Sequence, residues 1–87
     1  MHELSIAMSL VDAVCEELPR IGARVTVRSV RIRLGPLSGI VADALRFAFE
    51  VAVEDSPIAG ARLEIEDAPG RVLELKALEV IDDAEDC

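Results

Sequence analysis

The stretch that decides the fold is residues 25–34, VTVRSVRIRL, in which β-branched side chains alternate with polar ones. The alternation changes parity inside the stretch. The apolar residues up to Val27 share one face of an extended chain, whereas those from Val30 onward would lie on the other face. One extra residue near Arg28-Ser29 returns both sets to the same side, so we predict a β-bulge at this position.

Two helices are predicted, one before and one after this strand in the sequence. Residues 3–18 carry apolar side chains at spacings of three and four, which is typical of a helix with one buried face, and Pro19 is expected to end it. A second helix is expected from 39 to 54, with Ser38 as its N-cap. Its predicted buried face comprises Ile40, Val41, Ala44, Leu45, Phe47, Ala48, Phe49, Val51 and Ala52.

Two further strands complete the predicted fold. Residues 62–66 alternate cleanly, residues 73–80 alternate with a second change of parity near Ala77-Leu78, and residues 68–70 form a turn between them. The arginines of the first strand are expected to face away from the core and to meet glutamates of the other two strands. The resulting fold class is α+β, of order α-β-α-β-β, with two helices packed on one face of a three-stranded sheet.

Size and composition limit what such a chain can do. Its 87 residues suffice for one domain, expected at 1–81, followed by an acidic tail at 82–87 that we expect to be solvated. The net charge of −8 and the lack of Trp and Tyr argue against nucleic-acid binding. No stretch is long and apolar enough for a membrane span, and residues 1–3 lack the basic start of a signal peptide. Because Cys15 and Cys87 do not make a disulfide framework, we expect a cytoplasmic protein.

The first residues offer the best candidate site. The amine of Met1, the backbone nitrogen of His2 and the imidazole Nδ1 of His2 can reach one ion, closing one five-membered and one six-membered ring. Three such nitrogens in a plane suit Ni²⁺ or Cu²⁺. The bulk of His2 should hinder removal of Met1, which would keep the chelate intact. On spacing alone, a single histidine beside a chain end is more often a hydrated side chain, and Glu3 can equally serve the helix dipole.

No other pattern indicates a reaction site. The only histidine is His2, at the chain start, so the sequence offers neither a Ser/His/Asp nor a Cys/His arrangement. It contains no CxxC pair, no GxxxxGK[ST] loop and no GxGxxG motif. We therefore do not expect an enzyme.

Several segments, in order along nearly the whole chain, resemble the HypA/HybF family of hydrogenase nickel-incorporation proteins. They are residues 1–7 (MHELSIA), 33–39 (RLGPLSG), 44–50 (ALRFAFE), 61–66 (ARLEIE) and 75–80 (LKALEV). The opening Met-His-Glu is the most specific of them.

The resemblance implies a nickel metallochaperone. Proteins of this family carry Ni(II) to [NiFe]-hydrogenase, and in some bacteria to urease, and work with a HypB-type GTPase. Their nickel site lies at the amino end, which places it here on Met1 and His2, with Glu3 as a neighbour or ligand. The expected partners are that GTPase and the hydrogenase large subunit, and the chain is expected to be a monomer or homodimer.

One family feature is missing. Family members carry a zinc-binding insertion with two CxxC pairs between the last two strands, whereas here residues 66–72 lead directly into the strand that begins at Leu73. A structural zinc site needs four ligands of the Cys or His type, so no structural zinc is expected in this chain. The alternative function is a metal-free module that docks a nickel-handling GTPase or a hydrogenase subunit.

Overall fold

The structure, a computed structural model, describes residues 2–21 and 25–82. The elements follow the predicted order and form an α+β fold. They are α1 (Glu3–Ile21), β1 (Val25–Leu34), α2 (Ala42–Val53), β2 (Arg62–Asp67) and β3 (Leu73–Asp82).

The strand VTVRSVRIRL lies at the centre of the sheet, whose order is β2-β1-β3. It pairs in parallel with β2 and antiparallel with β3. The predicted bulge is confirmed, because Val27 pairs with Val80 and Ser29 with Glu79, which leaves Arg28 as the extra residue. A second shift makes Lys76 the extra residue of β3, beside the predicted change of parity.

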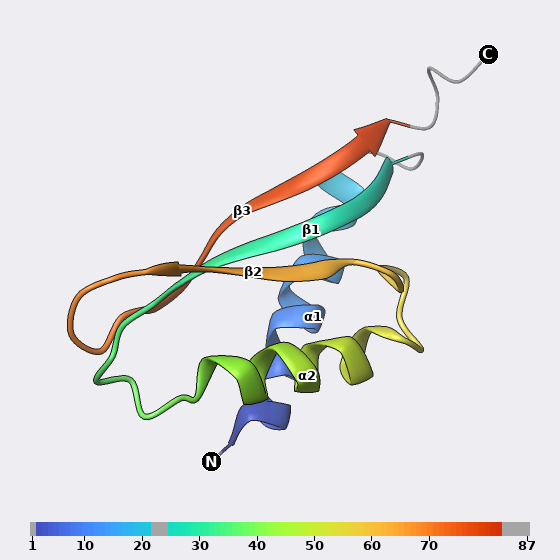
Figure 1. The fold of residues 1–87 in the computed structure, drawn as a ribbon. Helices are drawn as coiled ribbons and strands as arrows, with labels where there is room; N and C mark the ends of the chain where they lie inside the picture. The colour runs from blue at the N-terminus through green and yellow to red at the C-terminus, as the bar shows by residue number, and fades with distance from the viewer. Residues whose placement is uncertain (1, 22–24, 83–87) are drawn as a thin grey trace.

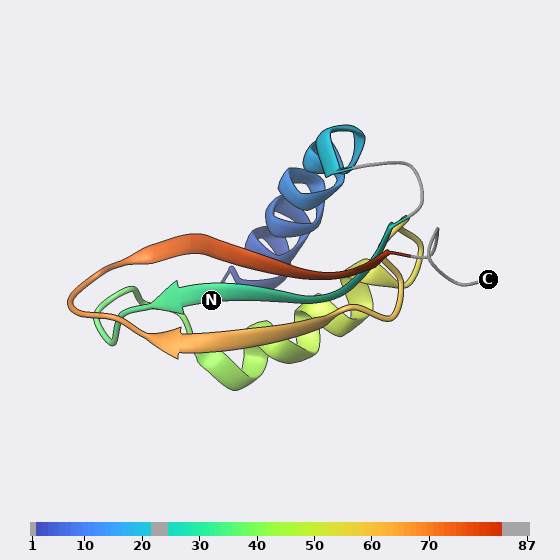
Figure 2. The same ribbon diagram turned by 90° about the horizontal axis from the view of Figure 1, so that it is seen from above.

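Both helices cover the same face of the sheet, as predicted (Figures 1 and 2). In Figure 1 the sheet lies above α2. The helix α1 passes behind α2 toward the start of β1 and the end of β3. The core between the layers is aliphatic apart from one phenylalanine. Its largest fully buried side chains are Phe49, Ile32, Leu45, Ile58, Val14 and Val30.

The second helix begins later than predicted. It starts at Ala42, and its N-cap is Val41, whose side chain cannot accept a hydrogen bond. The Ser38 hydroxyl instead accepts a hydrogen bond from the backbone N–H of Ile40 at 3.3 Å, within a local turn. The prediction of Ser38 as the N-cap was therefore wrong, because this short side chain found a donor two residues away.

The predicted buried face of α2 was too wide. Leu45 and Phe49 are fully buried, but Phe47 is 70% exposed and Val51 is 48% exposed. Apolar residues surround most of this helix, so hydrophobicity alone could not decide which of them face the sheet.

The first helix continues past the residue that was expected to end it. Pro19 lies inside α1, which extends to Ile21. A proline so close to a helix end removes one backbone donor and disturbs only the last turn, so the helix can continue briefly.

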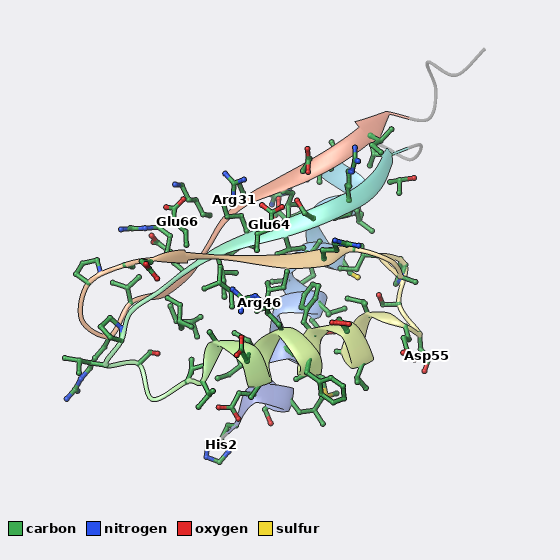
Figure 3. All side chains as sticks on the ribbon, viewed as in Figure 1. His2, Arg31, Arg46, Asp55, Glu64 and Glu66 are labelled. Atoms are coloured by element: carbon green, nitrogen blue, oxygen red, sulfur yellow. The ribbon has the colours of Figure 1, made fainter. Side chains whose placement is uncertain are left out.

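The face of the sheet opposite the helices carries the predicted arginine–glutamate pairs, and Figure 3 shows Arg31, Glu64 and Glu66 there. Arg31 pairs with Glu64 at 3.0 Å, and Arg33 pairs with Glu74 at 2.7 Å and with Glu66 at 3.7 Å. These exposed pairs satisfy one another within the sheet, so they do not form a basic patch.

The connection from β2 to β3 is tied to the end of β1. The backbone N–H of Gly35 donates to the carbonyl of Val72 at 2.8 Å, and that of Leu37 donates to the carbonyl of Gly70 at 2.8 Å. A Cβ atom on Gly35 would lie 2.2 Å from the Gly70 carbonyl oxygen, so this close approach requires glycine. Within the described residues, neither helix is long and apolar enough to cross a membrane.

Candidate metal centre

His2 lies just before α1, with its side chain exposed at the end of the molecule farthest from the sheet (Figure 3). Its backbone carbonyl accepts the first helical hydrogen bond, from the N–H of Ile6 at 3.0 Å. The backbone N–H groups at the start of a helix have no acceptor within that helix. A metal ion could therefore bind the His2 backbone nitrogen without breaking a helical hydrogen bond.

Glu3 joins the beginnings of the two helices. Its Oε2 accepts a hydrogen bond from the backbone N–H of Val41, the N-cap of α2, at 3.2 Å. A hydrogen bond from the chain's N-terminal amine, together with the Val41 N–H, lowers the pKa of Glu3 to about 2. A carboxylate at this position faces the positive ends of both helix dipoles. Glu3 thus serves α2 as the side-chain acceptor that Ser38 was expected to supply.

The predicted site residues are placed as follows. The structure brings His2 and Glu3 together at the start of α1, whereas Met1 lies outside the described residues. Within residues 2–21 and 25–82, no three side chains from His, Cys, Asp and Glu are grouped closely enough to hold a metal ion. The donors near the chain start are therefore the His2 imidazole, backbone nitrogens and the Glu3 carboxylate.

Sequence reasoning did not find the link between Glu3 and α2. The sequence predicted only that the Glu3 carboxylate suits the first turn of α1, because that role depends on position along one helix. The contact with Val41 joins residues 38 positions apart. No local pattern indicates that the two helices begin at the same place.

The remaining thiol of the described chain is less suited to metal binding. Cys15 is only partly exposed, on α1, and burial together with the nearby charge of Asp12 raises the pKa of its thiol. Since a thiolate is the form that binds metals, this shift disfavours coordination by Cys15 at neutral pH.

The fold is one that a solved nickel metallochaperone also has. The solution structure of the Ni metallochaperone HypA from Helicobacter pylori superposes with a TM-score of 0.69 at 29% identity, covering 78% of this chain and 58% of that chain. A second solution structure, of a HypA protein, shares the fold with a TM-score of 0.77 at 20% identity, covering 94% of this chain and 98% of that one. The chain belongs to the HypA family, described as hydrogenase/urease nickel incorporation metallochaperones, whose profile matches residues 1–76.

Curated relatives agree with this family. The hydrogenase maturation factor HypA of Roseiflexus sp. is 56% identical over 73 residues, which are 83% of this chain and 58% of that protein. The protein of the same name from Geobacter metallireducens is 46% identical over 71 residues, which are 82% of this chain and 61% of that protein. The chain thus spans about three fifths of the length of these relatives.

Proposed function

We propose that this chain is the nickel-carrying part of a hydrogenase maturation factor. Ni(II), its cargo, is bound by the amine of Met1 and by the backbone nitrogen and imidazole Nδ1 of His2, with Glu3 beside them. The ion is then delivered for maturation of [NiFe]-hydrogenase, with urease as the other possible destination. The partners in this proposal are a HypB-type GTPase and the large subunit of the hydrogenase.

The observation that carries the proposal is the position of His2. Its side chain is exposed, and its backbone nitrogen precedes the first helical hydrogen bond, which the His2 carbonyl accepts from Ile6. Both donors of one residue are therefore available to a single ion. Membership of the HypA family gives independent support, because the family is described by nickel incorporation.

An exposed chelate at the start of a helix suits a carrier better than an enzyme. Solvent and an incoming ligand can approach the ion from the open side, so the metal can leave by stepwise replacement of its donors. The backbone nitrogen must lose its proton to bind, so nickel affinity should rise with pH.

Calorimetric titration with Ni(II) at neutral pH tests the site. The unaltered chain should bind one ion, whereas His2→Ala and a variant with residues added before Met1 should each lose most of the affinity. A control variant in which Cys15 and Cys87 are both replaced by serine should bind as the unaltered chain does. Equal binding by all four proteins would show that the terminal chelate is wrong.

The absorption spectrum of the nickel complex tests the donor set separately. Coplanar amine, backbone and imidazole nitrogens predict a diamagnetic, planar Ni(II) signature. A six-coordinate signature would remove the backbone nitrogen from the ligands. If instead partner capture were unaffected by His2→Ala and by chelators, the metal-free docking module would be the better description.

A further inference from the structure

The two helices leave large apolar side chains exposed on the side of the helical layer away from the sheet. Leu4 and Met8 of α1 are 52% and 54% exposed, and Phe47 and Val51 of α2 are 70% and 48% exposed. We refer to these four side chains as the helix-pair surface. An isolated exposed leucine needs no explanation, but a group of this kind in an 87-residue chain indicates an interaction surface.

The periodicity of α2 shows where Phe47 and Val51 point. Successive side chains turn by about 100°, so Phe47 lies almost opposite Leu45 and Phe49, the residues buried against the sheet. On one flank of α2, Arg46 and Glu50 line a groove that continues onto β2. Val51 lies on the other flank, which faces α1.

The apolar residues of α1 are divided between two flanks in the same way. Ile6 and Leu10 line a groove together with Leu73 and Leu75, so this flank of α1 faces β3. Leu4 and Met8 lie on the opposite flank, toward α2. The helices begin side by side, because the Glu3 carboxylate accepts a hydrogen bond from the Val41 N–H. The exposed side chains of the two helices therefore form one surface.

Acidic residues surround this surface. The exposed acids on the solvent side of the two helices are Asp12 and Glu16 of α1, Asp43 and Glu50 of α2, and Glu54, the C-cap of α2. Arg46, the one basic residue of α2, is already paired with Asp43 at 2.8 Å. Two copies of this chain, each with a net charge of −8, would bring these acidic borders together, which disfavours a second copy as the occupant.

We propose that the helix-pair surface docks an amphipathic segment of a partner protein, with apolar side chains that cover Phe47 and Met8 and with Lys or Arg at its borders. Such a segment matches both the apolar centre and the acidic rim. The surface begins at Leu4, two residues after His2, so the bound partner would lie beside the chain start. Docking at this surface does not require the nickel site, and its test uses no metal.

The test uses a synthetic helical peptide with leucines on one face and lysines on the other, and a second peptide in which glutamates replace the lysines. Binding is measured by calorimetry in low salt with a chelator, and the contacts are mapped by NMR. The lysine peptide should bind, with the largest shifts at the four residues of the helix-pair surface. Phe47→Ser should weaken binding about tenfold, as expected for an aromatic residue at the centre of an interface.

Leu37→Ser is the matched control, because Leu37 is 68% exposed but lies in the loop before α2. It should leave binding unchanged, and circular dichroism should show that both variants fold. Three results would each overturn the proposal. They are equal effects of the two substitutions, NMR shifts centred away from the two helices, and a dimer of the unaltered chain in sedimentation that Phe47→Ser abolishes.

Discussion

Phe47 and Phe49 lie two positions apart on α2 and provide a matched pair of truncations. Phe49 is completely buried, beside a core that contains Leu45 and Ile58, whereas Phe47 is 70% exposed. Removing a buried phenylalanine side chain costs about 3–5 kcal/mol, because apolar contact is lost and a cavity remains. Only three tenths of the Phe47 surface is buried. If the cost scales with the buried fraction, truncating Phe47 to alanine should cost about 1 kcal/mol.

These costs are large relative to the stability of a chain of this size. A typical free energy of unfolding of 0.05–0.15 kcal/mol per residue gives about 4–13 kcal/mol for 87 residues. Phe49→Ala should therefore remove about a quarter or more of the stability of the protein. With a denaturant slope of about 1.5 kcal/mol per molar urea, its unfolding midpoint should fall by about 2–3 M, against less than 1 M for Phe47→Ala.

Urea unfolding followed by far-UV circular dichroism is the appropriate assay, since the chain has no Trp or Tyr to report by fluorescence. Both variants should show the same slope as the unaltered chain, so that the midpoints can be compared directly. Similar midpoints for Phe47→Ala and Phe49→Ala would refute the orientation of α2, and with it the helix-pair surface.

Three further substitutions test other contacts. Gly35→Ala should destabilise the fold by about 1–3 kcal/mol in urea unfolding, because its Cβ would lie 2.2 Å from the Gly70 carbonyl oxygen; an unchanged midpoint would contradict this packing. Glu3 has a folded pKa of about 2 against 4.5 in the unfolded chain, so its ionised form stabilises the fold above pH 4.5 and this contribution disappears as the pH falls toward 2. Glu3→Gln should therefore lower the melting temperature at pH 7, and this difference should shrink as the pH falls toward 2; a difference as large at pH 2 as at pH 7 would exclude this charge effect. Glu66→Gln removes the partner of Lys76, which lies 2.6 Å away and lowers the pKa of Glu66, so its effect on the melting temperature should be larger in low salt than in 1 M salt, and independence of salt would exclude an ion pair.

Local patterns predicted the order of elements and one irregularity inside the sheet. The parity change within VTVRSVRIRL indicated the bulge, because a side chain of the wrong parity would have left the core. The arginine–glutamate pairs could be predicted because alternation fixes which face each residue occupies. Both predictions depend on a period of two, which a short stretch of sequence shows clearly.

The features that sequence missed depend on contacts between distant segments. Phe47 and Phe49 are equally apolar, and only the position of β2 and α1 around α2 decides which of them is buried. Near the start of α2, likewise, a residue distant in sequence is the acceptor, because Glu3 binds the Val41 N–H while Ser38 binds the Ile40 N–H. His2 and Glu3 were placed together by simple adjacency, whereas the nearness of α2 to this site needed the fold.

The central position of β1 has a consequence for the order in which the sheet can assemble. Val25 at its start pairs with Asp82 at the end of β3, and its parallel partner β2 follows only after all of α2. During synthesis β1 therefore leaves the ribosome before either neighbouring strand has been made, and both of its edges remain unpaired until then. Folding that depends on such distant pairs is expected to be slower than that of a helical bundle of similar size. A nascent chain that stops before β3 would leave one edge of β1 without its antiparallel partner, and an unpaired edge invites non-native pairing, so β3 completes the protection of the first strand made.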